Sequence, residues 1–233
     1  MTNEPGPVPA ERALWRREQR DLEPQLAFIR DEFRAGFELV ARIDRPAVSI
    51  FGSARVAQDH PWCRVAAAIG ATFARQEWAV VTGGGPGVME AANRGAKEAG
   101  GLSVGLGIRL PHEERLNPWL DLSYEFQHFY ARKVCFVKAS EGFIACPGGW
   151  GTSDELLEAL VLIQTGKVDH FPVVLVGDGH WDRFRAWSEE MVREGTLAAD
   201  DLAIATYTND PDEAAHAVIA CYRRECDHVH HDG

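Results

Sequence analysis

Residues 146–155 read CPGGWGTSDE, and they join a short apolar run, Gly142–Ala145, to a longer one, Leu156–Ile163. The first run is typical of a buried strand and the second of a helix. The three glycines therefore lie at a strand-to-helix turn, where a ligand can approach the backbone closely and a helix N-terminus offers free N–H groups to an anion. We expect Asp154 and Glu155 in the first helical turn, beside this anion site.

Strands and helices are predicted to alternate on both sides of this turn. The predicted strands cover residues 47–51, 78–81, 102–108, 123–129, 143–145, 172–176 and 202–206, and the predicted helices cover 61–76, 88–99, 130–139, 156–166, 181–192 and 211–226. Several of the strands are unbroken apolar runs, as a sheet covered on both faces requires. The sequence therefore predicts an α/β fold with three layers, a Rossmann-like open and mostly parallel sheet with helices on both faces.

We expect this Rossmann-like domain to span residues 46–226. Residues 1–45 precede it and hold a Pro- and Gly-rich tail and an amphipathic helix over 9–41, with a potential break near Pro24. This helix can pack on the domain or on a second copy of the chain. Residues 227–233 are predicted to form a flexible tail, and their histidines to be mobile rather than metal ligands.

Composition limits the classes of function. The chain has 233 residues, of which 45% are hydrophobic, enough for one sizeable core. A net charge of -11 argues against duplex DNA or an anionic membrane as partner. The sequence lacks a run of about 20 apolar residues and a recognisable signal peptide. Its five scattered cysteines suit reduced thiols, so we expect a cytoplasmic protein.

A second glycine-rich turn, Thr82–Gly87, follows another predicted strand. Because ligands bind at the carboxyl ends of parallel strands, we expect this turn, the one after Cys146 and the loop starting at Gly52 to share one edge of the sheet. The Thr82–Gly87 turn is no clean dinucleotide fingerprint, and neither glycine-rich turn is a P-loop. Two glycine-rich turns on one edge nevertheless favour a binding site over tight turns alone.

Two pairs of polar residues can have a purely structural role instead of a role in binding. Thr152 and Glu155 have the spacing of a capping box, in which Thr152 would be the N-cap and Glu155 would fold back on its N–H. Arg132 and Lys133 lie within an apolar stretch and can belong to a solvated helix face. They can also reach a phosphate or a carboxylate, because their helix begins near the same sheet edge.

Three motifs in order resemble one family. Pro147–Glu155 matches PGGxGTxxE, and Phe129–Lys133 contains the RK element. Gly83–Met89 (GGGPGVM) resembles the GGGxxGxM element but has one residue fewer between its glycines. The chain resembles the LONELY GUY family of cytokinin riboside 5'-monophosphate phosphoribohydrolases, whose members are often labelled lysine decarboxylases. The similarity runs from about Val48 to Val176. The longer form of the second motif and the N-terminal helix resemble the larger-subunit branch, which implies a homo-oligomer, dimer or higher.

The resemblance implies hydrolysis of the N-glycosidic bond of a nucleoside 5'-monophosphate, such as AMP or isopentenyladenosine monophosphate, without a metal or cofactor. Arg132 and Glu155 would be the catalytic pair. The substrate and phosphate contacts would come from Gly52, Ser53, Gly84, Gly85, Glu113, Lys133, Gly148, Gly149, Trp150, Gly151, Thr152, Ser153 and Asp154. The chemistry fits, because a carboxylate can stabilise the positive charge that develops on the ribose or align the attacking water.

Two alternatives remain beside this interpretation, and a third, lysine decarboxylase, is rejected. A lysine decarboxylase needs a Schiff-base lysine for pyridoxal phosphate, and the sequence has no recognisable setting for one. A carrier of nucleotide or molybdenum cofactor would need the phosphate cradle but not the Arg132–Glu155 pair. A broader purine or pyrimidine monophosphate nucleosidase would use the same residues, and the sequence does not separate it from cytokinin activation.

Overall fold

The structure is a computed structural model that describes residues 22–110, 116–168, 171–177 and 179–223. Its strands are β1 (Ala47–Phe51), β2 (Ala79–Thr82), β3 (Ser103–Ile108), β4 (Leu122–Phe126), β5 (Phe143–Ala145), β6 (Val173–Val176) and β7 (Ala205–Thr208). Its helices are α2 (Leu22–Val40), α3 (Pro61–Arg75), α4 (Val88–Glu98), α5 (Phe129–Ala139), α6 (Trp150–Gln164), α7 (Asp182–Arg193), the 3-10 helix η1 (Ala199–Ile204) and α8 (Pro211–Tyr222).

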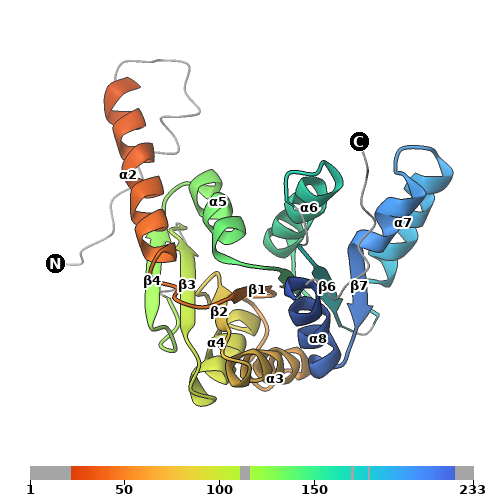
Figure 1. The fold of residues 1–233 in the computed structure, drawn as a ribbon, viewed down its shortest axis with the longest axis horizontal. Helices are drawn as coiled ribbons and strands as arrows, with labels where there is room; N and C mark the ends of the chain where they lie inside the picture. Colours follow the sequence, from red (N-terminus) through yellow and green to blue (C-terminus); the bar gives the residue numbers. More distant parts are fainter. Residues whose placement is uncertain (1–21, 111–115, 169–170, 178, 224–233) are drawn as a thin grey trace.

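The strands form one seven-stranded sheet in the order β4-β3-β2-β1-β5-β6-β7, and every neighbouring pair is parallel. Every residue of β1, β2, β5 and β6 is buried, which explains their unbroken apolar runs. One hydrophobic cluster joins the sheet to α3, α4 and α8, and a second joins its other face to α2, α5 and α6 (Figure 1). The predicted three-layer Rossmann-like fold is confirmed.

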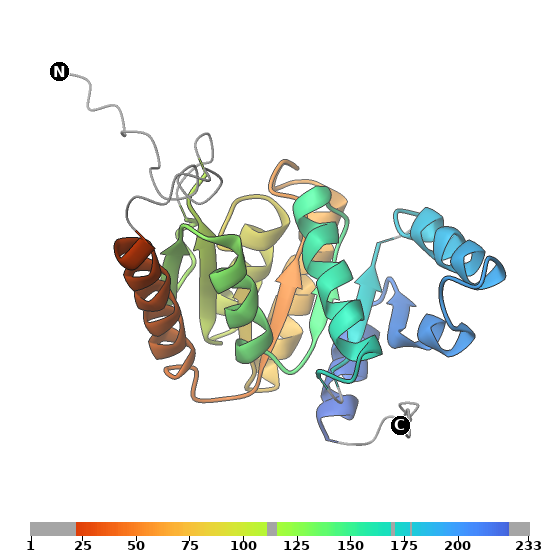
Figure 2. The same cartoon turned by 90° about the horizontal axis from the view of Figure 1, so that it is seen from above.

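The order of the strands determines where a ligand can bind. The chain runs outward from β1 to β4 and then returns to place β5 on the free side of β1, where Phe51 pairs with Ala145. The order reverses between β1 and β5, so the loops that follow these two strands flank the switch point of the sheet. Figure 2 shows α2, α5 and α6 side by side over one face, with α6 following directly from this point.

Helix α6 begins earlier than the sequence suggested. Its first residue is Trp150 and its N-cap is Gly149, in extended backbone with φ −100° and ψ −153°. The prediction of Thr152 as N-cap in a capping box is therefore wrong, as is the placement of Asp154 and Glu155 in the first turn. Both Thr152 and Glu155 are buried, so their side chains face the interior of the protein.

Two smaller boundaries also differ. Residues 199–204 form η1, and β7 starts at Ala205 rather than at Leu202. Helix α2 is described from Leu22, so the earlier part of the helix predicted over 9–41 lies outside the described residues. Helix α8 ends at Tyr222 with Arg223 as its C-cap, before the predicted end at residue 226. The predicted tail over 227–233 lies outside the described residues as well. Of the helices that are described, none is both long and apolar enough to cross a bilayer.

Candidate active site

Backbone hydrogen bonds join three loops at the switch point, namely the loops that follow β1, β2 and β5. The Ser53 N–H donates to the carbonyl of Pro147 (3.0 Å), and the Ser53 carbonyl accepts from the N–H of Val88 (2.9 Å). Gly87 has a φ of 67°, and a Cβ added there would lie 2.3 Å from the Ser53 carbonyl oxygen. Only glycine fits this position without displacing the backbone. Gly52 and Ser53 are thus brought against both glycine-rich turns, as predicted.

A buried polar network holds the turn over residues 83–85. The Thr82 hydroxyl donates to Oδ1 of Asn93 (2.6 Å) and accepts from the N–H of Gly84 (2.9 Å). Nδ2 of Asn117 lies 2.9 Å from Oδ1 of Asn93, 3.1 Å from the Gly84 carbonyl and 3.2 Å from the Gly85 carbonyl. These bonds fix the turn, because a satisfied buried network rigidifies what it contacts.

The start of α6 forms an open cradle. A Cβ added to Gly149 or Gly151 would meet nothing within 4 Å, and Trp150 between them is 92% exposed. Among the described residues, no side chain caps this helix terminus, which leaves N–H groups for an anion. Gly148 differs, because a Cβ there would lie 2.1 Å from Oγ1 of the buried Thr152.

Ser153 forms its hydrogen bonds within the first turn of α6. The Ser153 N–H (3.0 Å) and hydroxyl (3.2 Å) both donate to the carbonyl of Gly149. The predicted contact from Ser153 would therefore require its hydroxyl to change partner.

Arg132 joins the second glycine-rich turn to Glu155. Nη2 of Arg132 lies 3.8 Å from Oε1 of Glu155, and it would lie 3.2 Å from a Cβ added at Gly83. The guanidinium carbon is 5.2 Å from the centre of the Phe136 ring, a cation–π contact. Glu155 comes from α6 and is only 4% exposed. The predicted catalytic pair is thus brought together, at one end of the cradle.

Lys133 lies between α5 and α6 among three carboxylates. Its Nζ is 2.7 Å from Oε2 of Glu158, 2.9 Å from Oδ2 of Asp154 and 4.0 Å from Oε2 of Glu155. Burial lowers the pKa of Lys133, but its hydrogen bonds with Glu158 and Asp154 and the charge of Glu155 outweigh that effect and raise the pKa. Lys133 is therefore a fixed positive charge that ties the two helices together beside Glu155.

The environment of Glu155 favours its neutral form. Burial raises the pKa of Glu155 to about 7, although the positive charges of Arg132 and Lys133 act in the opposite direction. A carboxyl group with a pKa near neutrality can exchange a proton with a substrate or a water molecule at physiological pH. The arrangement thus combines an anion cradle, an acid and an arginine within one site.

The sequence matches a known family and several known proteins. The family model described as possible lysine decarboxylase matches residues 89–218. A cytokinin riboside 5'-monophosphate phosphoribohydrolase of Mycobacterium marinum is 31% identical over 185 residues, which cover 77% of this chain and 98% of the relative. The chain belongs to the LONELY GUY family.

Further matches agree with this assignment. A protein of Mycobacterium tuberculosis with the same name as the M. marinum relative is 34% identical over 137 residues, covering 58% of this chain and 73% of that one. Among solved structures, the molybdenum cofactor binding protein of Rippkaea orientalis has 25% identity and a TM-score of 0.58 over 77% of this chain and 99% of its own. The LONELY GUY motifs of the chain thus lie on a fold that is shared with a cofactor-binding protein.

One residue beside the cradle escaped the sequence analysis of this LONELY GUY chain. Nε2 of His180 accepts a hydrogen bond from the N–H of Gly148 (3.4 Å), and burial lowers the pKa of His180. The imidazole lies against the Trp62 ring at 5.6 Å. His180 follows β6, so the rule that ligands bind at the carboxyl ends of strands could have found it. Asn93 ends the longer form of the second motif, residues 83–93, but the sequence analysis assigned it no role, and Asn117 belongs to no motif.

Glu113 and Asp154 differ from the other predicted contact residues. Glu113 lies outside the described residues. Asp154 is described, and its carboxylate pairs with Lys133. The part of the LONELY GUY chain that the structure describes contains no group of three or more His, Cys, Asp or Glu side chains placed to hold a metal ion.

The raised pKa of Glu155 predicts a cost in stability at alkaline pH. Between the ordinary value of 4.5 and about 7, the folded chain holds a proton on Glu155 that the unfolded chain releases. The free energy of unfolding therefore falls as pH rises through this window. Glu155→Gln has no such proton to lose. Its free energy of unfolding minus that of wild type should therefore be roughly 2 to 3 kcal/mol larger at pH 8 than at pH 5. Urea unfolding at both pH values measures this, and a constant difference would contradict it.

Proposed function

We propose that this protein hydrolyses the N-glycosidic bond of nucleoside 5'-monophosphates, giving the free base and ribose 5-phosphate. One observation carries the proposal: a buried carboxyl group, Glu155, faces Arg132 one helical turn inside an open, glycine-rich helix terminus. One turn of helix spans about 5 Å, which matches the reach from a 5'-phosphate to the sugar ring. The names of the mycobacterial relatives support the same reaction.

The roles of the residues follow from the chemistry. The N–H groups of Gly149 and Gly151 at the start of α6 would hold the 5'-phosphate. As the bond between C1' and the base breaks, its electron pair leaves with the base and positive charge builds on the ribose. The Glu155 carboxylate stabilises that charge and accepts a proton from the water that attacks C1', while the departing base takes up one proton from solvent to become the neutral free base. Arg132 orients the sugar or the departing base.

The substrate class is a nucleoside monophosphate, with AMP and isopentenyladenosine monophosphate as the first candidates. The relatives named for cytokinin riboside monophosphates favour an adenine base with an N6 substituent. A broader nucleosidase would use the same cradle and the same acid. The choice of base therefore has to be measured by comparing kcat/KM across monophosphates.

A binding or carrier protein without hydrolase activity is the second candidate. The likeness to the molybdenum cofactor binding protein of Rippkaea orientalis favours it. A carrier needs an anion cradle, but it has no use for a buried acid with a pKa near neutrality beside an arginine. The Arg132–Glu155 pair therefore favours the hydrolase.

One assay separates the two functions. The protein is incubated with AMP, other nucleoside monophosphates and isopentenyladenosine monophosphate, and free base is measured by chromatography. We expect base release, and we expect adenosine to be a poor substrate because it has no phosphate for the cradle. If no base is released from any monophosphate while Glu155→Ala binds nucleotide like wild type, the protein is a carrier. Equal turnover of adenosine and AMP would remove the cradle from the mechanism.

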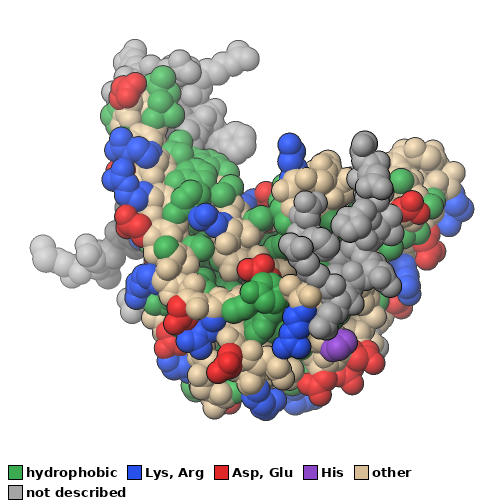
Figure 3. Space-filling model, in the orientation of Figure 1, with side chains coloured by type: hydrophobic (Ala, Val, Ile, Leu, Met, Phe, Trp, Pro, Cys, Tyr) green, Lys and Arg blue, Asp and Glu red, His purple; other side chains and the backbone are tan. Residues whose placement is uncertain are grey.

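We also propose that the protein is a homo-oligomer, a dimer or larger. Helix α5 carries exposed apolar side chains, Phe129, Tyr130 and Val134, and hydrophobic side chains gather over α5 beside α2 in Figure 3. An exposed apolar patch of this kind is typical of an interface. Light scattering should give at least twice the mass of one chain, 25.8 kDa. A monomer would contradict the proposal.

A further inference from the structure

Helix α2, outside the sheet, carries a buried carboxylate. Its other charged residues near the middle of the helix, Arg30, Asp31 and Arg34, are exposed, whereas Glu32 is 2% exposed. Burying a carboxylate costs several kcal/mol unless it is paired and hydrogen-bonded. An amphipathic helix that only had to pack on the domain would have an apolar residue at this position.

Glu32 has two partners just before α5. Oε1 accepts a hydrogen bond from the N–H of Gln127, and Oε2 is hydrogen-bonded to Nδ1 of His128. A carboxylate can only accept, so Nδ1 of His128 is the donor. Both side chains are almost fully buried. His128 is the N-cap residue of α5 and makes no capping bond with its own side chain, so α2 supplies the carboxylate at this helix terminus.

His128 connects Glu32 to Arg132. The carbonyl of His128 accepts the hydrogen bond of the Arg132 N–H (3.3 Å), one of the first backbone bonds of α5. The imidazole also stacks on the ring of Tyr130 at 5.0 Å with an interplanar angle of 26°. Two hydrogen bonds therefore lead from the carboxylate of α2 to the backbone of Arg132, whose guanidinium faces Glu155.

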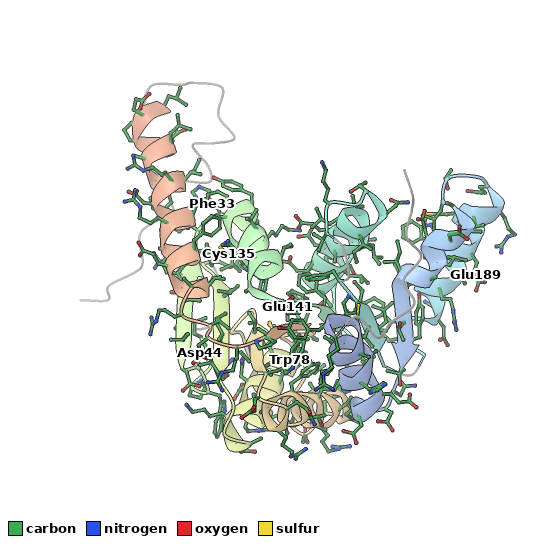
Figure 4. All side chains as sticks on the ribbon, viewed as in Figure 1. Phe33, Asp44, Trp78, Cys135, Glu141 and Glu189 are labelled. Atoms are coloured by element: carbon green, nitrogen blue, oxygen red, sulfur yellow. The ribbon has the colours of Figure 1, made fainter. Side chains whose placement is uncertain are left out.

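Close packing keeps α2 at a fixed distance from α5. A Cβ added at Gly36 would lie 2.5 Å from Sγ of Cys135 and 2.9 Å from the ring of Phe126. Phe33 of α2 and Cys135 of α5 lie between the two helices in Figure 4. The Glu32 carboxylate therefore acts on α5 from a helix that cannot shift toward it or away from it without disturbing these contacts.

We propose that Glu32 is a positioning residue for Arg132, and that α2 thereby contributes to the geometry of the active site. By holding Gln127 and His128, Glu32 fixes the first turn of α5 and so the direction of the Arg132 side chain. This inference rests on the proposed function, because it assigns Arg132 a role in turnover. The phosphate cradle lies on α6, so it should be independent of Glu32.

The test compares three variants of the full chain. Glu32→Met removes both acceptors and keeps the volume and the helix propensity. Glu32→Gln keeps an acceptor for Gln127 and can bond His128 in its other tautomer. Leu39→Ala is the matched control, because it opens a cavity under the same helix without touching His128. We expect Glu32→Met to lower kcat for AMP at least about 10-fold with KM within about 3-fold, since small displacements of catalytic groups are costly.

The remaining expectations separate positioning from simple destabilisation. Glu32→Gln should recover most of the kcat, and Leu39→Ala should lower the Tm about as much as Glu32→Met while keeping kcat within about 2-fold. A Glu32→Met enzyme with wild-type kcat, or an equal loss of kcat in Leu39→Ala, would overturn the proposal.

Amide hydrogen exchange provides a readout that does not depend on turnover. Glu32→Met should accelerate exchange over residues 128–133, and Leu39→Ala should not. If wild type releases no base, the proposed function fails by itself, whereas unchanged exchange over 128–133 overturns the positioning of α5 whether or not the protein is a hydrolase.

Discussion

Glu155→Gln should lower kcat for AMP by at least about 1000-fold, because it removes the charge that stabilises the developing cation and the group that accepts the proton of water. Glutamine has the same shape as glutamate, so the packing around the site should remain. The N–H groups at the start of α6 are unchanged, and the Kd for AMP should stay within about 3-fold of wild type. Stopped assays of base release and calorimetric titration with AMP measure the two quantities.

Glu158→Gln is the control for this substitution. Glu158 lies one turn further along α6 and also contacts Lys133, at 2.7 Å, but it does not belong to the proposed catalytic pair. Its removal should leave kcat within about 3-fold, as is usual for a partly exposed ion pair. Equal losses in the two variants would assign the effect to Lys133 rather than to Glu155.

The pH profile tests the same assignment in the wild type. The pKa of Glu155 is about 7, and the carboxylate is the active form in this mechanism. The kcat/KM should therefore rise with pH up to about 7 and then level off. A fall in activity above pH 7 would instead make the protonated Glu155 the active form, as a general acid.

The second large effect is expected at the cradle. Gly151→Ala should weaken the binding of AMP and of inorganic phosphate by about 100-fold, because its methyl group enters the open space that the phosphate would fill and breaks two charge-assisted hydrogen bonds. A Cβ at position 151 has no protein atom within 4 Å, and alanine has a higher helix propensity than glycine. The Tm of the variant should therefore equal or exceed that of wild type. Calorimetric titration and thermal unfolding of the same sample measure both.

Gly148→Ala provides the contrast. Its Cβ would collide with Oγ1 of Thr152, so this variant should lose stability as well as affinity. If Gly151→Ala bound phosphate like wild type, the start of α6 would not be the anion site, and the phosphate would have to be held elsewhere on the sheet edge.

The sequence predicted the sheet well because its central strands are buried on both faces and are therefore unbroken apolar runs. It also predicted that the loops after Gly52, Thr82 and Cys146 meet, because the carboxyl ends of parallel strands share an edge. The predicted start of α6 was too late, because Thr152 and Glu155 have the spacing of a capping box. A capping box would require the helix to begin directly after Thr152, whereas it begins at Trp150, and Glu155 is buried beside Arg132 of another helix.

The contacts that the sequence did not predict join residues far apart in the chain. Glu32 looked like one more charge in a charged helix, since its partners Gln127 and His128 lie more than 90 positions away. His180 meets Gly148 from a different strand. Asn117, which precedes β4, bonds to the second glycine-rich turn. Periodicity and motifs describe neighbours along the chain, and these contacts depend on the folded arrangement.

The burial of Glu155 has a practical consequence for engineering this protein. A collection of variants screened only for resistance to heat at alkaline pH would enrich replacements of Glu155 by neutral residues, since each removes an unfavourable buried charge. Under the proposed function, the most heat-resistant variants in such a collection would be inactive ones. Any effort to make the protein more durable should therefore score base release in the same round, or leave position 155 out of the mutated set.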